Sequence, residues 1–148
     1  MANHVRKQLR DAVVTAVTGL ATTGTHVHGW RVYALQEADE LPALSVYVTD
    51  EEASRITIHA PAVVERRVTV HVQGVAKASS SVEDTLDTIA KEVEVALASG
   101  VVIGSTTVPL EYTGCEVDIA RGDKPIGMVD LRFSAVIHNT ATAPDVLT

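Results

Sequence analysis

The sequence predicts one α/β (α+β) domain: a mixed, mainly antiparallel sheet with two helices packed on one face and a closing β-hairpin. Three observations support this fold class. Two segments place apolar residues at helical spacing, the strongest strand segments alternate apolar and polar residues, and valine is the most frequent residue. Strands with one apolar and one polar face are typical of a sheet whose helices lie on one side. The domain is expected to span residues 1–139, and the small, polar residues 140–148 are expected to form a flexible C-terminal tail.

The two predicted helices cover residues 3–20 and 81–99. In both segments, apolar residues recur at intervals of three and four, so each helix has one face to bury. Ser81 followed by Asp84 predicts a side-chain cap at the start of the second helix. Gly100 is expected to end that helix in a left-handed conformation.

The first half of the predicted sheet lies between the helices. Residues 21–29 lack periodicity and are expected to form a loop, which a short strand follows at 30–35. Alternation over 43–49 predicts a half-buried strand that ends at the acidic segment 50–52. Residues 51–61 are expected to form an exposed arm or a long hairpin, and the clearest strand of the chain begins near Val63 or Arg66.

The second half of the sheet is predicted as a hairpin. Apolar residues occupy even positions over 108–112 and odd positions over 115–119, so a bulge at Thr113-Gly114 is needed to keep both sets on one face. Residues 121–125 make the connection, and the last strand alternates over 129–137. The pattern therefore ends in two antiparallel strands.

The composition excludes two classes of protein. Twelve Lys and Arg against nineteen Asp and Glu give a formal net charge of −7, whereas tight nucleic-acid binding needs clustered cations. No apolar run reaches the length of a transmembrane helix. Neither DNA recognition nor membrane insertion is expected.

Side chains with catalytic or metal-binding chemistry form no recognisable motif in the sequence. His26 and His28 have H-x-H spacing, but no acidic residue or cysteine lies nearby to complete a tetrahedral metal site. Cys115, the single cysteine, is expected to lie on the apolar side of its strand as an inert thiol. The sequence contains no nucleophile elbow and no phosphate-binding glycine loop. We therefore expect no enzymatic activity, no metal and no cofactor.

The polar face of the sheet and the arms at 50–65 and 120–125 are the candidate interaction surfaces. Such a face is either simply solvated or presents a flat surface to neighbouring subunits, and the sequence leaves both interpretations open. Its expected members are Thr69, His71, Gln73, Asp130, Arg132, Ser134 and His138.

Two stretches of the sequence, and the order of its elements, are similar to a known family. One stretch is the opening helix, from His4 to Leu9-Arg10-Asp11-Ala12-Val13. The other is the acidic turn, proline and strand of Glu37–Thr49. Over residues 3–139 the chain thereby resembles the lambda-type phage tail terminators (minor tail protein U-like). It differs from them in a longer 50–65 segment and an added C-terminal tail.

The resemblance implies a structural protein at the head-proximal end of the virion tail, assembled in the host cytoplasm. It implies a homohexameric ring that caps the tail tube, stops its polymerisation and provides the docking surface for the head-completion connector. The implied partners are the chain itself, the tail tube protein and the connector, with no membrane. Genomic DNA would pass through an acidic lumen without specific binding, because like charges repel.

Ring contacts of this kind are expected to combine buried surface with polar rims and arginine pairs. The candidate residues for subunit contacts are Asp50, Glu51, Glu52, Arg66, Arg67, Asp123 and Arg132.

Two other roles are the alternatives to a tail terminator. One is another head–tail connector or a tail tube subunit, and the other is a small enzyme or ligand-binding domain.

Overall fold

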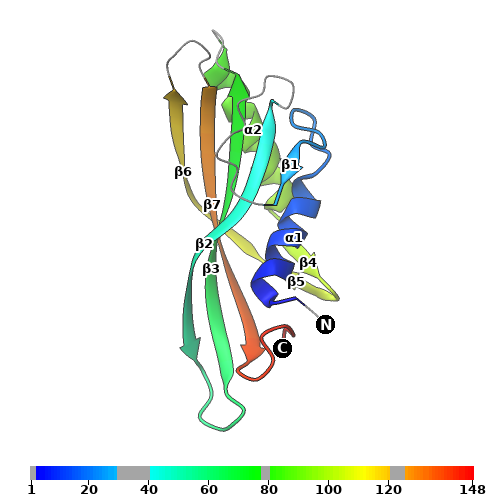
Figure 1. Cartoon of the computed structure of the whole chain (residues 1–148), viewed down its shortest axis with the longest axis vertical. Coiled ribbons are helices and arrows are strands. Elements are labelled where there is room, and N and C mark those ends of the chain that lie inside the picture. The colour runs from blue at the N-terminus through cyan, green and yellow to red at the C-terminus, as the bar shows by residue number, and fades with distance from the viewer. Residues whose placement is uncertain (1–2, 30–40, 78–80, 121–125) are drawn as a thin grey trace.

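The computed structural model describes residues 3–29, 41–77, 81–120 and 126–148. The predicted acidic turn, the strand at 30–35 and the connection at 121–125 lie wholly or mostly outside these residues. The elements, in chain order, are α1 (Val5–Val17), β1 (Val27–His28), β2 (Ala43–Arg55), β3 (Val63–Lys77), α2 (Val82–Leu97), β4 (Val101–Ile103), β5 (Thr106–Val108), β6 (Leu110–Ala120) and β7 (Ile126–Thr140) (Figure 1).

A twisted five-stranded sheet in the order β1-β2-β3-β7-β6 forms the body of the molecule. β1 runs parallel to β2, and the other neighbours are antiparallel. β4 and β5 form a separate two-stranded hairpin. The predicted α+β class, the mixed and mainly antiparallel sheet and the closing hairpin of β6 and β7 are confirmed.

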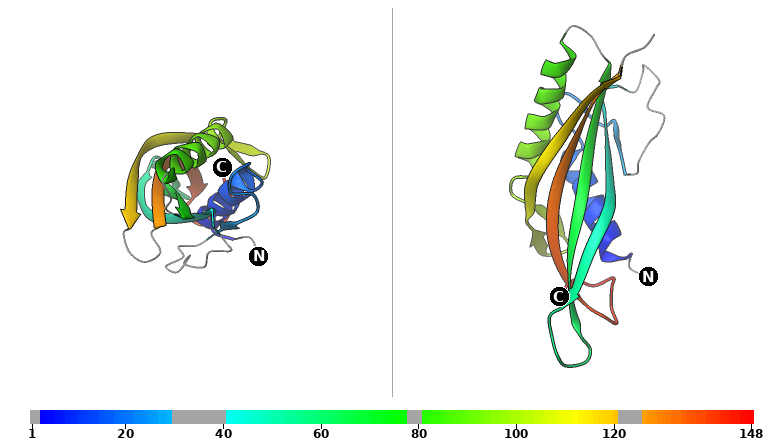
Figure 2. Two further views of the ribbon diagram at one scale, coloured as in Figure 1. Left: turned by 90° about the horizontal axis from the view of Figure 1, so that it is seen from above. Right: turned by 90° about the vertical axis from the view of Figure 1, so that its left-hand side faces the viewer.

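Both helices lie on one face of the sheet, which curls around them when viewed from above (Figure 2). Each helix buries one stripe, for example Leu9 of α1 and Ile89 of α2. The facing sheet residues alternate strictly along β7, where Leu131, Phe133 and Ile137 are buried and their neighbours are half-buried. The apolar stripes predicted from the sequence therefore meet in a single core.

Two glycines allow α2 to approach the sheet closely. A Cβ on Gly74 of β3 would lie 2.8 Å from Ile89 Cγ2, and a Cβ on Gly127 of β7 would lie 2.5 Å from Val82 Cγ2. Any larger residue at these positions would push the helix away, because packed interiors have no spare volume.

The first strand of the β2–β3 hairpin is longer than predicted. The expectation that it ends at residues 50–52 is wrong, because β2 continues to Arg55 after a register shift at Thr49. Pairing with β3 supplies the hydrogen bonds for this extension, and Arg67 lies directly opposite Glu52. The predicted long hairpin is confirmed, and it projects beyond the helices (Figure 1).

The start of β2 is buried on both faces, and not on one as the alternation predicted. Ala43 and Val75 form a small second cluster with Leu41, Ile126 and Met128 on the face away from the helices. This cluster closes one end of that face with apolar side chains. The polar part of the face lies further along the strands.

Of the other local predictions, some are confirmed and others are wrong. The bulge between Tyr112 and Gly114 is confirmed, as is the left-handed Gly100, with φ of 80°. The loop expected at 21–29 contains β1, because residues 27 and 28 pair with β2, and the β4–β5 hairpin was not expected. Ser81 occupies the cap position of α2 without a side-chain capping hydrogen bond, and its carbonyl instead accepts from Thr85.

The C-terminal segment after Thr140 folds back onto α1 and β7. The Val5 amide donates to the carbonyl of Pro144 at 2.9 Å, and the Thr148 amide donates to that of His138 at 3.0 Å. Leu147 packs against the core. Flexibility of this segment stays a prediction, while these contacts define its position. No described helix is long and apolar enough to cross a bilayer.

Replacing Gly74 with alanine tests the close packing of α2. We expect a loss of about 1–3 kcal/mol in the free energy of unfolding, because the new methyl group would overpack the interface with Ile89. Urea denaturation measures the loss. Gly29→Ala is the matched control, since its Cβ would meet only Val14 Cγ2 at an ordinary 3.5 Å. Equal stability of the two variants would contradict the packing argument.

Candidate assembly surface

The predicted polar residues of β3 and β7 do share the sheet face away from the helices, which we call the outer face. They alternate with buried core residues, and opposite pairs such as His71 and Arg132 adjoin across the two strands. All are half-buried. The outer face comprises Thr69, His71, Gln73, Asp130, Arg132, Ser134 and His138.

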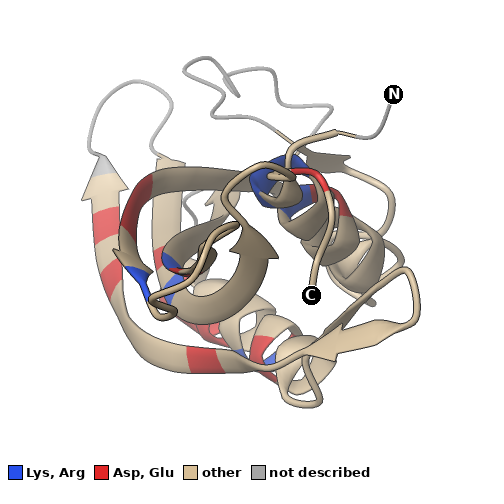
Figure 3. Cartoon of the chain, turned by 90° about the horizontal axis from the view of Figure 1, so that it is seen from below, with Lys and Arg blue, Asp and Glu red and all other residues tan. Residues whose placement is uncertain are grey.

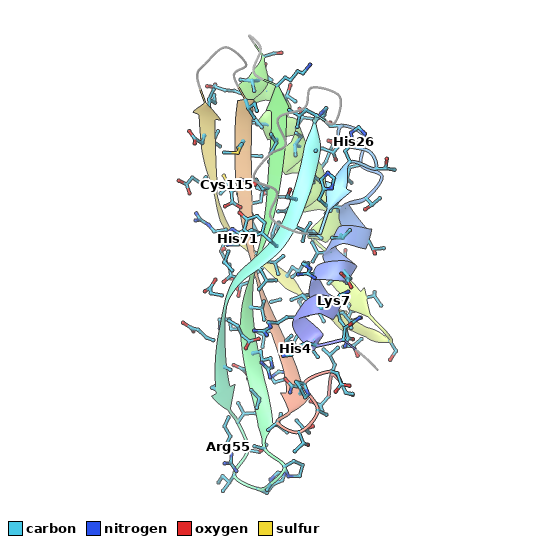
Figure 4. All side chains as sticks on the ribbon, in the orientation of Figure 1. His4, Lys7, His26, Arg55, His71 and Cys115 are labelled. Atoms are coloured by element: carbon cyan, nitrogen blue, oxygen red, sulfur yellow. The ribbon has the colours of Figure 1, made fainter. Side chains whose placement is uncertain are left out.

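His71 ties three strands together on the outer face (Figure 4). Its Nδ1 lies 3.0 Å from Asp130 Oδ1 of β7, and its Nε2 lies 2.8 Å from Thr49 Oγ1 of β2. Its ring stacks on Tyr47, with centroids 4.9 Å apart and planes within 4°. Thr49 Oγ1 also lies 2.9 Å from Asp50 Oδ1.

The order Thr49, His71, Asp130 resembles the connectivity of a nucleophile, a base and an acid. A hydroxyl has one proton and a carboxylate only accepts. The Thr49 hydroxyl lies within hydrogen-bond distance of both Asp50 Oδ1 and His71 Nε2, so it can donate its single proton to only one of them. In either case the contacts of His71 cross-link β2, β3 and β7.

Two of the predicted contact residues pair with each other inside the chain. Arg66 Nη1 lies 2.8 Å from Glu51 Oε2, and Arg66 Nε donates to the Oδ1 atom of buried Asn139 at 2.6 Å. The side chains of Glu51 and Arg66 are only 13% and 15% exposed. Arg6 of α1 adds a longer contact of 3.8 Å to Glu51. This polar cluster closes the end of the core under the start of α1.

The other predicted contact residues lie nearer solvent. Glu52 and Arg67 are exposed and face each other across the β2–β3 hairpin, and Asp50 is exposed beside the bulge. Arg132 is half-buried on the outer face, opposite Gly114 of β6. Asp123 lies outside the described residues. Contacts of these residues with another subunit stay a prediction.

A groove between α1 and β2 was not expected from the sequence. It has a volume of about 470 Å³ and opens beside the part of β2 that lacks a neighbouring strand among the described residues. Figure 4 shows His4 and Lys7 at the start of α1. The sequence shows the cations Arg6, Lys7 and Arg10, but not that the described part of β1 leaves this edge open. We call this site the basic groove; it is lined by His4, Arg6, Lys7, Arg10, Val48, Thr49, Asp50 and Glu51.

The opposite edge of the sheet is strand β6, which carries acidic residues on the outer face. Glu111, Glu116 and Asp118 are exposed there, and none forms an ion pair with another described residue. We call these three residues the acidic edge. Glu116 lies directly opposite Asp130, so like charges adjoin across β6 and β7.

Strand β6 also exposes apolar side chains on its other face. Tyr112 is 42% and Val117 50% exposed, and Cys115 is exposed too. The prediction that Cys115 lies on the apolar face of its strand is confirmed, but the thiol is exposed, because β6 is the edge strand and this part lies outside the core; its inertness stays a prediction. A hydrogen bond with Cys115, together with burial, raises the pKa of Tyr112 to about 12.

The tip of the β2–β3 hairpin has a defined shape. Arg55 donates to the carbonyl oxygens of Thr57 and Ile58 at 2.7 and 2.6 Å, which fixes the turn. Ile58 itself is 97% exposed. The hairpin therefore presents an apolar side chain at the far end of a rigid arm.

Comparison with known families decides what kind of protein carries these surfaces. The model of the family described as phage minor tail protein U matches residues 4–136, which is almost the whole fold from α1 into β7. The chain belongs to this family. The resemblance stated from the sequence is thereby confirmed, and this member of the phage minor tail protein U family is a structural tail protein of the virion.

Two further comparisons add no argument about the function of the chain. A chain in the virion of a native gene transfer agent (GTA) particle is 21% identical, with a TM-score of 0.47 over 92% of each chain. Comparison with curated protein sequences gives no match.

Replacing Arg66 with methionine in this tail protein tests the internal ion pair. Glu51 would lose its partner in a largely buried position, so we expect about 1–3 kcal/mol less stability in urea denaturation. Arg67→Met, on the exposed side of the same strand, is the matched control and should stay within about 0.5 kcal/mol of wild type. A larger loss from Arg67→Met would contradict this assignment.

His4 makes stability depend on pH. Burial, with repulsion from Arg6 and Arg66, lowers the pKa of His4 below the ordinary 6.5 against an opposing effect of Glu51, and its Nδ1 accepts a hydrogen bond from the Arg6 amide. The unfolded chain thus binds the proton more readily, and stability falls as the pH drops below about 6.5. His4→Asn keeps a capping acceptor that does not titrate. Thermal melting should show a smaller acid-induced loss for this variant, and parallel losses would contradict the expectation.

Proposed function

We propose that this tail protein is the tail terminator. In this role it forms a homohexameric ring at the head-proximal end of the tail. The ring caps the tail tube, stops its polymerisation and offers the docking surface for the head-completion connector. The observation that carries the proposal is the family match over residues 4–136, which spans every element that builds the core.

The arrangement of the sheet supports self-association. β6 at one edge and the second half of β2 near the other leave backbone groups without a neighbouring strand among the described residues. Exposed strand edges are ready sites for contact with another chain. The exposed Glu52, Arg67 and Asp50, together with Arg132, are the proposed polar contacts around them.

The charge of the chain supports passage of DNA through the ring. Each copy carries a formal net charge of −7, and six copies around a lumen would repel phosphate groups. DNA would then slide through without being held, because binding requires cations that displace counterions. The protein thus requires no DNA-binding site for this role.

Labelled virions distinguish the terminator from other tail proteins. A gold label on the C-terminus should appear in negative-stain images at one point per tail, next to the head, because a terminator is added once. Assembly in the host without this protein should give tubes of no fixed length. Label along the whole tube would contradict the terminator role.

A role as a tail tube subunit, in place of the terminator role, is the alternative that the family leaves open. Images of the purified protein separate the two, since a tube subunit polymerises into indefinite tubes and a terminator stops at single rings. Adding the purified protein to growing tubes should end their growth if it is the terminator. Continued growth would contradict the proposal.

A further inference from the structure

We propose that the basic groove of one copy receives the acidic edge of a second copy. The inference rests on the proposed ring and names the two surfaces that would close it. Both surfaces are present on every chain, so each copy would give one contact and receive one. The occupant of the groove is therefore another molecule of the same protein.

The basic groove contains a cation without an acidic partner in the described part of the chain. Lys7 pairs with Asp11 at 2.6 Å, Glu51 accepts from Arg66 at 2.8 Å through Oε2, and Asp50 accepts from Thr49 at 2.9 Å. Arg10 forms no ion pair with another described residue. It brings to the groove a positive charge that no described carboxylate pairs with, so the site favours an incoming carboxylate.

The acidic edge offers exposed carboxylates that could pair with this cation. Glu111, Glu116 and Asp118 lie on one face of β6, are exposed and form no ion pair with described residues. Glu116 lies opposite Asp130 across the sheet, and Asp130 contacts His71, whereas Glu116 has no such partner among the described residues. A cation from another molecule would supply one. The charges of the two surfaces are complementary.

The two surfaces cannot meet within one chain. β6 and α1 lie on different sides of the molecule, where Figure 3 shows acidic bands along β6 and basic residues at the start of α1. A contact between two different surfaces of identical chains is heterologous, and repeating it gives a closed ring or an open filament. This is the type of contact that the proposed ring requires.

Charge reversal on each side tests the contact. Arg10→Glu places a negative charge in the groove, and Glu116→Arg places a positive charge on the acidic edge. Each variant alone should self-associate at least about tenfold more weakly than wild type, because like charges then face each other. Sedimentation at millimolar protein concentration measures the association.

Mixing the two variants gives the sharper result. In the mixture, the acidic groove of Arg10→Glu meets the basic edge of Glu116→Arg. The unchanged groove of Glu116→Arg likewise meets the unchanged acidic edge of Arg10→Glu. The mixture should regain wild-type association, and native mass spectrometry should show assemblies with equal numbers of both variants. Lys91→Glu and Asp87→Arg on exposed positions of α2 change the net charge equally and should associate like wild type. Circular dichroism and thermal melting verify that all four fold.

Four results would overturn this inference. Three concern association: normal association of each variant alone, failure of the mixture to recover, and absence of wild-type association at these concentrations. The fourth is binding of a short DNA duplex that Arg10→Glu abolishes, which would make the groove a phosphate site. Label at the tail end would still support the terminator role in each case, so the two proposals fail separately.

Discussion

Packing of both described helices against one face of the sheet is the constraint on which the rest of the structure depends. Strands β3 and β7 pair over fifteen residues, and the helices cover only part of that length. Where the cover is complete, every second residue is apolar and buried. Under the start of α1 it thins out, and Arg66, Glu51 and Asn139 take the places of core residues. Further on, β7 stays paired with β3 as far as Val63, and only the turn between Arg55 and Val63 projects beyond the paired strands.

The same constraint decides how the sheet edges can be used. A five-stranded sheet with free edges risks uncontrolled pairing with other chains. Bulges interrupt β2 at Thr49, beyond the residues that pair with β1, and the outer strand β6 at Thr113. The acidic edge also repels a second acidic edge. Symmetric pairing of β6 with β6 is thereby disfavoured. A contact between unlike surfaces escapes this repulsion, which is why the charge pattern favours head-to-tail assembly over a two-fold dimer.

Sequence patterns predict features that repeat along one helix or strand. They fail for features that depend on which strand pairs with that element. The stripes of α1 and α2, the alternation of β7 and the bulge after Tyr112 follow from periodicity alone, and the structure has them. The extension of β2 to Arg55 depends on β3 as a partner, which local sequence does not reveal. The basic groove depends on β1 being only two residues long. Likewise, Cys115 lies on the strand face that the sequence predicts, but its exposure depends on how far the core extends along β6.

Burial separates structural charges from charges available for assembly. Arg66 and Glu51 pair inside the molecule, since a buried charge favours an ionic partner. On the surface an unpaired carboxylate costs little, because water solvates it. Glu111, Glu116 and Asp118 can therefore remain unpaired in the free subunit and still gain a partner in an assembly. Sequence alone gives both sets the same appearance, as charged residues on strands. Only the geometry shows that the first set closes the core and that the second set lies at the surface without an ion pair to another described residue.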